Sequence, residues 1–151
     1  MYNVGVNVGG NNYAGSGAAQ LTVFDPSLGS FRGIGAIIRN GRPATFLFNI
    51  KYRKNGTPQG GLLYVERRAT GWMTIQTNAV QALSIVGNTG VIVGNAIVNG
   101  VGNHTFRATL VDSSKSGRGD RFGLQVISPS GAVVPDLTFD PITMKAGNIR
   151  R

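Results

Sequence analysis

Apolar and polar residues alternate along much of this chain, and short runs of this kind recur every ten to fifteen residues from residue 20 onward. A period of two is typical of β-strands, because successive side chains point to opposite faces. In residues 46–52 the even positions Phe46, Phe48 and Ile50 are apolar, whereas Asn49 and Lys51 are polar. No segment keeps helical spacing over eleven residues, and residues 77–83, where a short helix fits, suit a strand equally well. The pattern predicts an all-β, hairpin-rich fold, an antiparallel barrel or barrel-like sandwich of about nine or ten strands.

Asn-Gly pairs separate several of these runs and are strong signals for tight hairpins, because both turn positions favour positive φ. Asn40-Gly41 recurs fifteen residues later as Asn55-Gly56, and Asn99-Gly100 is a third pair. The first two turns predict a three-stranded meander over residues 31–39, 44–53 and 60–67. The other predicted strands cover residues 21–24, 72–77, 80–86, 91–98, 104–111, 121–127 and 137–144.

The N-terminal segment has its own composition. Tyr2, Val4, Val6 and Val8 alternate with small or polar residues, and a stretch rich in Gly and Asn follows. We therefore expect residues 1–17 to form an N-terminal strand and a Gly/Asn-rich linker, and residues 18–151 to form a single β domain. The strand is expected to pair with the domain's own sheet or with a neighbouring molecule, which makes a homo-oligomer a hypothesis.

Charge adds a partner class to this picture. The 151 residues include 15 basic and 6 acidic side chains, which gives a net charge of +9. Such an excess favours polyanions such as nucleic acid, an acidic polysaccharide or anionic lipid headgroups, and charge alone does not choose among them. A solvated strand surface that keeps the chain soluble explains the same excess. No apolar run approaches the roughly 20 residues that a membrane-spanning helix needs, so we expect no transmembrane segment. The absence of cysteine excludes disulfides and thiolate catalysis, and is compatible with a bacterial surface.

Few residues are available for catalysis. The single histidine, His104, begins a predicted hairpin strand, and no nucleophile elbow accompanies it. One histidine and no cysteine exclude the usual zinc sites, and we expect neither a metal nor a cofactor. The chain is therefore expected to be non-catalytic. The alternative is a β-barrel enzyme, a cyclase, isomerase or hydrolase, that uses an acid such as Glu66 or Asp112 in an apolar lumen.

The segment 112–120 resembles a calcium-binding loop in the spacing of its oxygen-bearing side chains, but its flanks are strands and it contains Lys115 and Arg118. Its Arg118-Gly119-Asp120 tripeptide also matches an integrin-recognition motif. We interpret it as a plain hairpin loop.

Aromatic and basic residues interleave in one part of the chain. Such an arrangement forms stacking and cationic surfaces for sugars or single-stranded nucleic acid. An aromatic girdle that packs beneath arginine side chains explains the same pattern. The candidate ligand-binding residues are Tyr52, Arg53, Tyr64, Arg67, Arg68 and Trp72.

Four segments carry a resemblance to a known family: residues 41–46 (GRPATF), 87–94 (GNTGVIVG), 99–106 (NGVGNHTF) and 119–124 (GDRFGL). Together they resemble the small all-β accessory domain of bacterial surface and extracellular multidomain proteins, the post-COAP type, over residues 29–148. The resemblance implies an extracellular or cell-surface location and no known catalysis. It supplies no site residues, and the N-terminal strand and linker depart from it.

Overall fold

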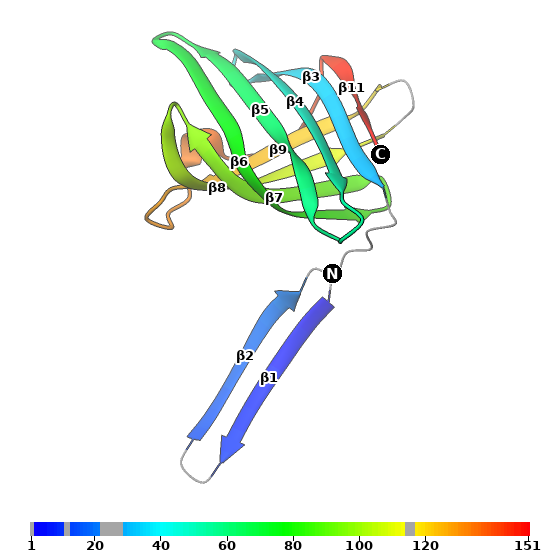
Figure 1. Cartoon of the computed structure of the whole chain (residues 1–151). Helices are drawn as coiled ribbons and strands as arrows, with labels where there is room; N and C mark the ends of the chain where they lie inside the picture. The colour runs from blue at the N-terminus through cyan, green and yellow to red at the C-terminus, as the bar shows by residue number, and fades with distance from the viewer. Residues whose placement is uncertain (1, 11–12, 22–28, 114–116) are drawn as a thin grey trace.

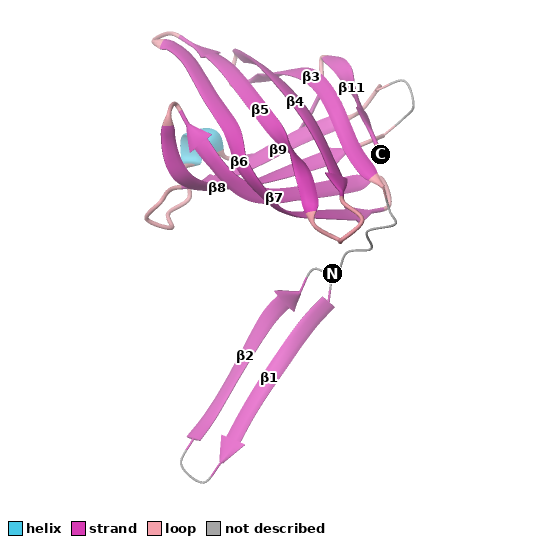
Figure 2. Ribbon diagram, viewed as in Figure 1, coloured by secondary structure: helices cyan, strands magenta, loops and turns pink. Residues whose placement is uncertain are grey.

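The computed structural model of the chain describes residues 2–10, 13–21, 29–113 and 117–151. They form two antiparallel sheets (Figures 1 and 2). The smaller sheet is a hairpin of β1 (Tyr2–Gly10) and β2 (Tyr13–Leu21). The larger sheet contains β3 (Ser30–Arg39), β4 (Arg42–Tyr52), β5 (Pro58–Arg68), β6 (Gly71–Val86), β7 (Thr89–Val98), β8 (Val101–Val111), β9 (Arg121–Ile127), β10 (Phe139–Thr143) and β11 (Ala146–Arg150).

The nine-stranded sheet is curled, and its strand order is β10-β9-β8-β7-β6-β5-β4-β3-β11. Strands β3 to β9 follow one another as a meander, and Figure 1 shows them wrapping around a common interior. The prediction of an all-β, barrel-like, hairpin-rich fold is confirmed. Among the described residues the one helical element is η2 (Pro135–Leu137), a single 3₁₀ turn.

The last part of the chain connects the two ends of this sheet. Strand β10 is antiparallel to β9 at one end, and β11 is antiparallel to β3 at the other. Between them, the backbone N–H of Met144 donates to the Asp120 carbonyl, and that of Lys145 donates to the Ala36 carbonyl. Both ends of the curled sheet are therefore held by one segment of chain, residues 139–150.

The Asn-Gly turns differ in conformation although all of them join consecutive strands. Asn40 and Gly41 have φ of 50° and 74°, and Asn99 and Gly100 have 47° and 83°, as a tight hairpin turn requires. At Asn55-Gly56 only the glycine has positive φ, 78°. There the Asn55 side chain instead accepts a hydrogen bond from the backbone N–H of Thr57 at 3.1 Å, so the prediction of positive φ at both positions is wrong for this turn.

The interior is filled by the side chains that alternate inward along the strands. In β4 the even positions from Ala44 to Ile50 are buried and the odd positions are exposed, as the sequence predicted. The Phe46 and Phe122 rings stack 4.0 Å apart across the interior. Strand β6 joins the predicted strands 72–77 and 80–86 through two register irregularities, and residues 77–83 are strand.

One further sequence prediction needs correction, and one strand was missed. Residues 13–17 belong to β2 and not to a linker, because backbone pairing with β1 requires no bulky side chain. Strand β11 was not predicted, since Ala146-Gly147-Asn148 lacks the β-branched and aromatic residues that mark strands. The predicted strand 21–24 lies mostly outside the described residues.

Candidate functional site

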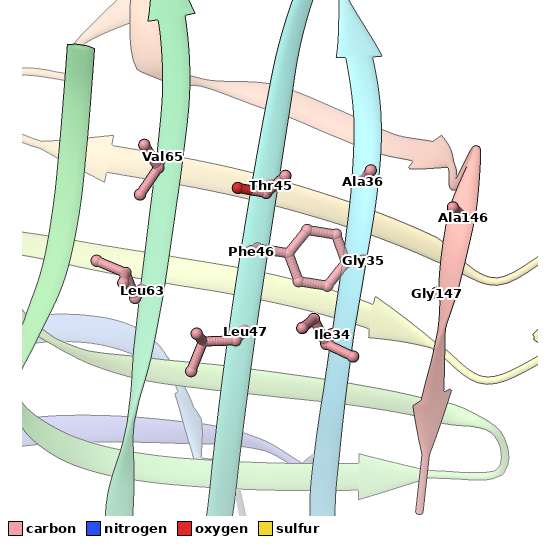
Figure 3. Close-up of a pocket in the computed structure, with 10 residues that line it drawn as sticks. All are labelled: Ile34, Gly35, Ala36, Thr45, Phe46, Leu47, Leu63, Val65, Ala146 and Gly147. Atoms are coloured by element: carbon pink, nitrogen blue, oxygen red, sulfur yellow. The ribbon is translucent and has the colours of Figure 1, made fainter.

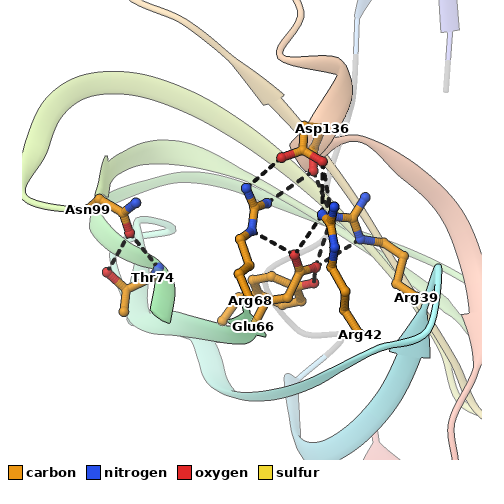
Figure 4. A network of polar contacts seen from close by, with 8 residues as sticks. Arg39, Arg42, Glu66, Arg68, Thr74, Asn99 and Asp136 are labelled. Atoms are coloured by element: carbon orange, nitrogen blue, oxygen red, sulfur yellow. Dashed lines mark hydrogen bonds and ion pairs between the residues drawn. The ribbon is translucent and has the colours of Figure 1, made fainter. Parts of the chain in front are cut away.

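The most concentrated polar cluster lies inside one end of the curled sheet (Figure 4). Glu66 follows Leu62 and Tyr64 at the inward positions of β5, and its side chain is fully buried. Its Oε2 accepts hydrogen bonds from Arg39 Nε at 3.0 Å, Arg39 Nη2 at 2.8 Å and the Tyr64 hydroxyl at 2.8 Å. Arg39, on β3, is itself 5% exposed. A buried carboxylate is thus matched by a buried guanidinium.

An outer layer of charge covers this pair. Oε1 of Glu66 accepts from Arg68 Nε at 2.9 Å and lies 3.5 Å from Arg42 Nη1. Arg42 and Arg68 also pair with the carboxylate of Asp136, which η2 holds over this end of the sheet. Arg39 Nη2 donates to the Asp136 carbonyl at 2.7 Å. The cluster therefore contains three arginines and two carboxylates.

The electrostatics of the cluster favour ionised carboxylates. Burial raises the pKa of Glu66, but hydrogen bonds from Tyr64 and Arg39 and the charges of Arg39 and Arg68 outweigh it, so that this pKa lies below its ordinary value. Burial, and then the adjacent Glu66, raise the pKa of Tyr64 well above its usual range. Hydrogen bonds and charges of Arg42 and Arg68 likewise outweigh burial and lower the pKa of Asp136.

This arrangement suits a structural ion-pair network better than proton transfer. Both oxygens of Glu66 accept hydrogen bonds from protein donors. Asp112, the other candidate acid, lies at the opposite end of the strands, where its backbone N–H donates to Asn88 and its Oδ2 accepts from the Arg151 backbone N–H at 3.3 Å. The structure does not bring the two candidate acids together, and buried aromatic and aliphatic side chains occupy the interior between them.

The six predicted ligand-binding residues do not form one surface. Tyr64 is buried beside Glu66, and Arg68 is turned into the ion-pair network. Tyr52 is also directed inward, because its hydroxyl donates to the Leu83 carbonyl and accepts from the Leu83 backbone N–H. Tyr64 and Arg68 both donate hydrogen bonds to the Glu66 carboxylate.

The remaining three predicted residues are exposed but separated. Arg67 and Trp72 are cross-strand neighbours on β5 and β6, and Trp72 is 65% exposed. Arg53 follows the far end of β4, where its Nε donates to the Gln59 side chain. The stacking and cationic surface predicted from their spacing is therefore divided between two ends of the sheet.

A group of cations that the sequence prediction did not single out lies where β3 begins and β4 and β11 end. Arg32 is directly opposite Arg150, and Ser30 is opposite Lys51. Arg53 and Lys54 follow in the β4–β5 turn. The only acidic residue within strands β3, β4, β5 and β11 is the buried Glu66. We call the exposed cations Arg32, Lys51, Arg53, Lys54 and Arg150 the basic end.

The outward side of the same strands is apolar. Ile34, Leu47 and Leu63 form one cross-strand row, and Ala36, Thr45 and Val65 form the next. Ile34 is 65% exposed and Leu47 49%. These two rows border a hollow of about 470 Å³, which Figure 3 shows with Ala146 and Gly147 of β11 on its far side. We call the two rows the outer apolar face.

The loop 112–120, of which residues 114–116 lie outside the described residues, is held by Asp120. This side chain is fully buried, and it accepts from the backbone N–H groups of Ser113 at 2.8 Å and Ile149 at 2.7 Å. Both oxygens are engaged by the protein, which agrees with a structural hairpin loop. Among the described residues, no group of three or more His, Cys, Asp or Glu side chains is placed to hold a metal ion.

A signal for the ion-pair network was present in the sequence. Arg39 shares the inward alternation of Phe31 and Ile37, and Glu66 shares that of Leu62 and Tyr64. A charged residue in a core position requires a buried partner of opposite charge. Asp136 carried no such signal, because it belongs to an irregular connection that reaches the cluster only through the tertiary fold.

No helix in the described part of the chain is long and apolar enough to cross a membrane. The segments that carry the family resemblance lie mainly in hairpin turns and adjoining strands, and that resemblance stays an expectation. Comparisons of this chain with protein-family models, with curated proteins and with solved structures found no match.

Proposed function

We propose that this chain is a non-catalytic β domain that binds an acidic polysaccharide through its basic end. The observation that carries this proposal is the clustering of exposed cations. Arg32 of β3, Lys51 of β4 and Arg150 of β11 gather at one end, and the one acid within these strands and β5 is buried in an ion-pair network. An extended polyanion can contact several such cations at once.

The filled interior supports a surface function. Phe31, Phe46, Phe106 and Phe122 are each no more than 2% exposed, and the rings of Phe46 and Phe122 stack across the space in which a substrate would have to bind. Glu66, the acid that an enzyme would use there, is fully engaged with Arg39, Arg68 and Tyr64. These observations weigh against the alternative of a barrel enzyme. An extracellular, bacterial setting, which the family resemblance implies, suits a polysaccharide partner.

Binding of polygalacturonate, an acidic polysaccharide, tests the proposal when two double variants are compared by isothermal titration at low salt. R32Q/K51Q removes two cations of the basic end. R67Q/R107Q removes two exposed cations that lie elsewhere, so the net charge of the two variants is the same. Exposed charge contacts contribute about 0.2–1 kcal/mol each, so R32Q/K51Q should weaken binding by about two- to thirtyfold.

The control double variant should change the affinity by less than about twofold, because its effect is confined to the net charge. Equal weakening in both variants would mean that diffuse charge, and not the basic end, attracts the polymer. A wild-type chain that binds single-stranded nucleic acid but not polygalacturonate would overturn the proposed partner.

A further inference from the structure

The outer apolar face is unusual for an antiparallel sheet with a filled interior. Such a sheet commonly exposes a polar face to water, which produces regular alternation of apolar and polar residues. Strands β3, β4 and β5 depart from this alternation, because Ile34, Leu47 and Leu63 occupy outward positions that match one another across the strands. Residues apolar on both sides of a sheet are typical of sheets that are covered on both sides.

The N-terminal hairpin also has apolar residues at alternate positions of one strand. Its strands β1 and β2 are nine residues each and hydrogen-bond to each other in a sheet of their own. Tyr2, Val4, Val6 and Val8 occupy alternate positions of β1, and the register places Val4 opposite Ala19. Alternate positions of a strand share one face. Residues 1–24 contain no charged side chain.

Such a hairpin needs a partner for its stability. A single two-stranded hairpin is marginal in water unless its apolar side packs against another element. Within one chain the outer apolar face is not covered by it, since Ile34 remains 65% exposed and Leu47 49% exposed. Figure 1 shows the hairpin apart from the curled sheet. The chain therefore carries an exposed apolar face on β3–β5 and a separate hairpin whose sequence places apolar residues at alternate positions of β1.

We propose that the β1–β2 hairpin of a second copy of this chain docks on the outer apolar face. The hairpin is about 30 Å long at roughly 3.3 Å per residue, and its two strands lie about 5 Å apart. The acceptor rows run across β3, β4 and β5, whose spacing gives a surface about 10 Å wide between the outermost strand axes. The acceptor surface is therefore wide enough to hold a two-stranded hairpin.

Two further observations select this mode of assembly. The two edge strands of the curled sheet, β10 and β11, have only five residues each. Short edge strands disfavour the addition of another strand, so packing on a face remains. The outer apolar face is flanked by Arg32 and Arg67, and an uncharged hairpin can cover it without bringing like charges together. Mutual exchange of hairpins between two copies forms a closed, two-fold dimer.

The proposal goes beyond polysaccharide binding and leaves the basic end exposed. Complementation between full-length variants tests it. V4D/V6D places two charges in the hairpin and leaves the acceptor face intact, whereas L47D charges the acceptor face and leaves the hairpin intact. V101D is the matched control, because Val101 is 59% exposed on β8, away from this face.

Light scattering at micromolar concentration should find that the wild type and V101D are dimers. The V4D/V6D and L47D variants should each be monomers, and an equimolar mixture of the two should recover a heterodimer joined through the one intact hairpin and the one intact face. Circular dichroism confirms that each variant retains its strands. Dimers of V4D/V6D alone, or no association in the mixture, would overturn the proposal.

Cysteine cross-linking identifies the contact, because the natural chain has no cysteine. A mixture of V6C and L47C chains should form a disulfide between chains under mild oxidation, whereas a mixture of V6C and V101C should not. A monomeric wild type in which V6C/L47C forms only a disulfide within one chain would show docking in the same molecule, which would also overturn the proposal.

Discussion

Replacement of Glu66 by glutamine removes the charge at the centre of the ion-pair network while keeping the volume of the side chain. The fully buried carboxylate holds Arg39, which is 5% exposed and donates to Oε2 from two of its nitrogens. The variant leaves this buried guanidinium without its nearest counter-charge, with only the Asp136 carboxylate at 3.9 Å, and places an amide donor near other donors. Removal of one partner from a buried pair costs about 3–5 kcal/mol.

Chemical denaturation followed by far-UV circular dichroism measures this loss. Thermal denaturation gives a second measure, because a loss of 1 kcal/mol lowers the melting temperature of a domain of this length by about 2–4 °C. The melting temperature of E66Q should therefore fall by about 6–20 °C. The control is D140N, because Asp140 is an exposed carboxylate on β10 whose neutralisation should change the unfolding free energy by less than about 0.5 kcal/mol. A loss below about 1 kcal/mol in E66Q would refute the structural role of the pair.

Three further predictions concern the same fold. The folded-state pKa of Glu66 lies below its ordinary value of 4.5. The stabilisation that Glu66 provides is therefore present above pH 4.5 and is lost as the pH falls through the depressed pKa. Unfolding curves between pH 7 and pH 2 should show this loss of stability, and the loss should be smaller in E66Q. Y64F removes the hydroxyl that donates to Glu66 at 2.8 Å and should cost about 1.5–3 kcal/mol in urea denaturation, whereas a change near zero would contradict the importance of that hydrogen bond. Gly60 has φ of 126°, and a Cβ there would lie 1.9 Å from the Asn49 carbonyl oxygen. G60A should therefore lower the unfolding free energy by at least about 1–3 kcal/mol. The control is G61A, where the nearest atom to a Cβ is 4.0 Å away, and it should change the unfolding free energy by less than about 1 kcal/mol in the same assay.

The architecture was largely predictable because strands and tight turns are encoded locally. Alternation along residues 46–52 identified the inward side of β4, and Asn40-Gly41 marked the turn before it. Strand β11 was not predictable in the same way. Its first three residues are small or polar, and its pairing with β3 depends on contacts more than one hundred residues away along the chain.

The candidate site was less predictable than the fold. The inward alternation of Glu66 was visible in the sequence, but its partner Arg39 is brought to it only by the tertiary fold. Asp136, which shares the arginines of the network, reaches them through the 3₁₀ turn. Arg53 and Trp72, which the sequence analysis grouped in one surface, lie at opposite ends of β5, because residues near in sequence can be separated by the length of a strand.

The salt dependence of polygalacturonate binding tests the proposed function most directly. Contacts between exposed cations and a polyanion weaken as salt is added, because mobile ions screen them and counterions are released on binding. We predict that the affinity of the wild type falls steeply between about 20 and 200 mM NaCl, where the screening length shortens markedly, and that R32Q/K51Q shows a shallower slope. An affinity that does not change over this range, or equal slopes for the two proteins, would contradict binding through the basic end.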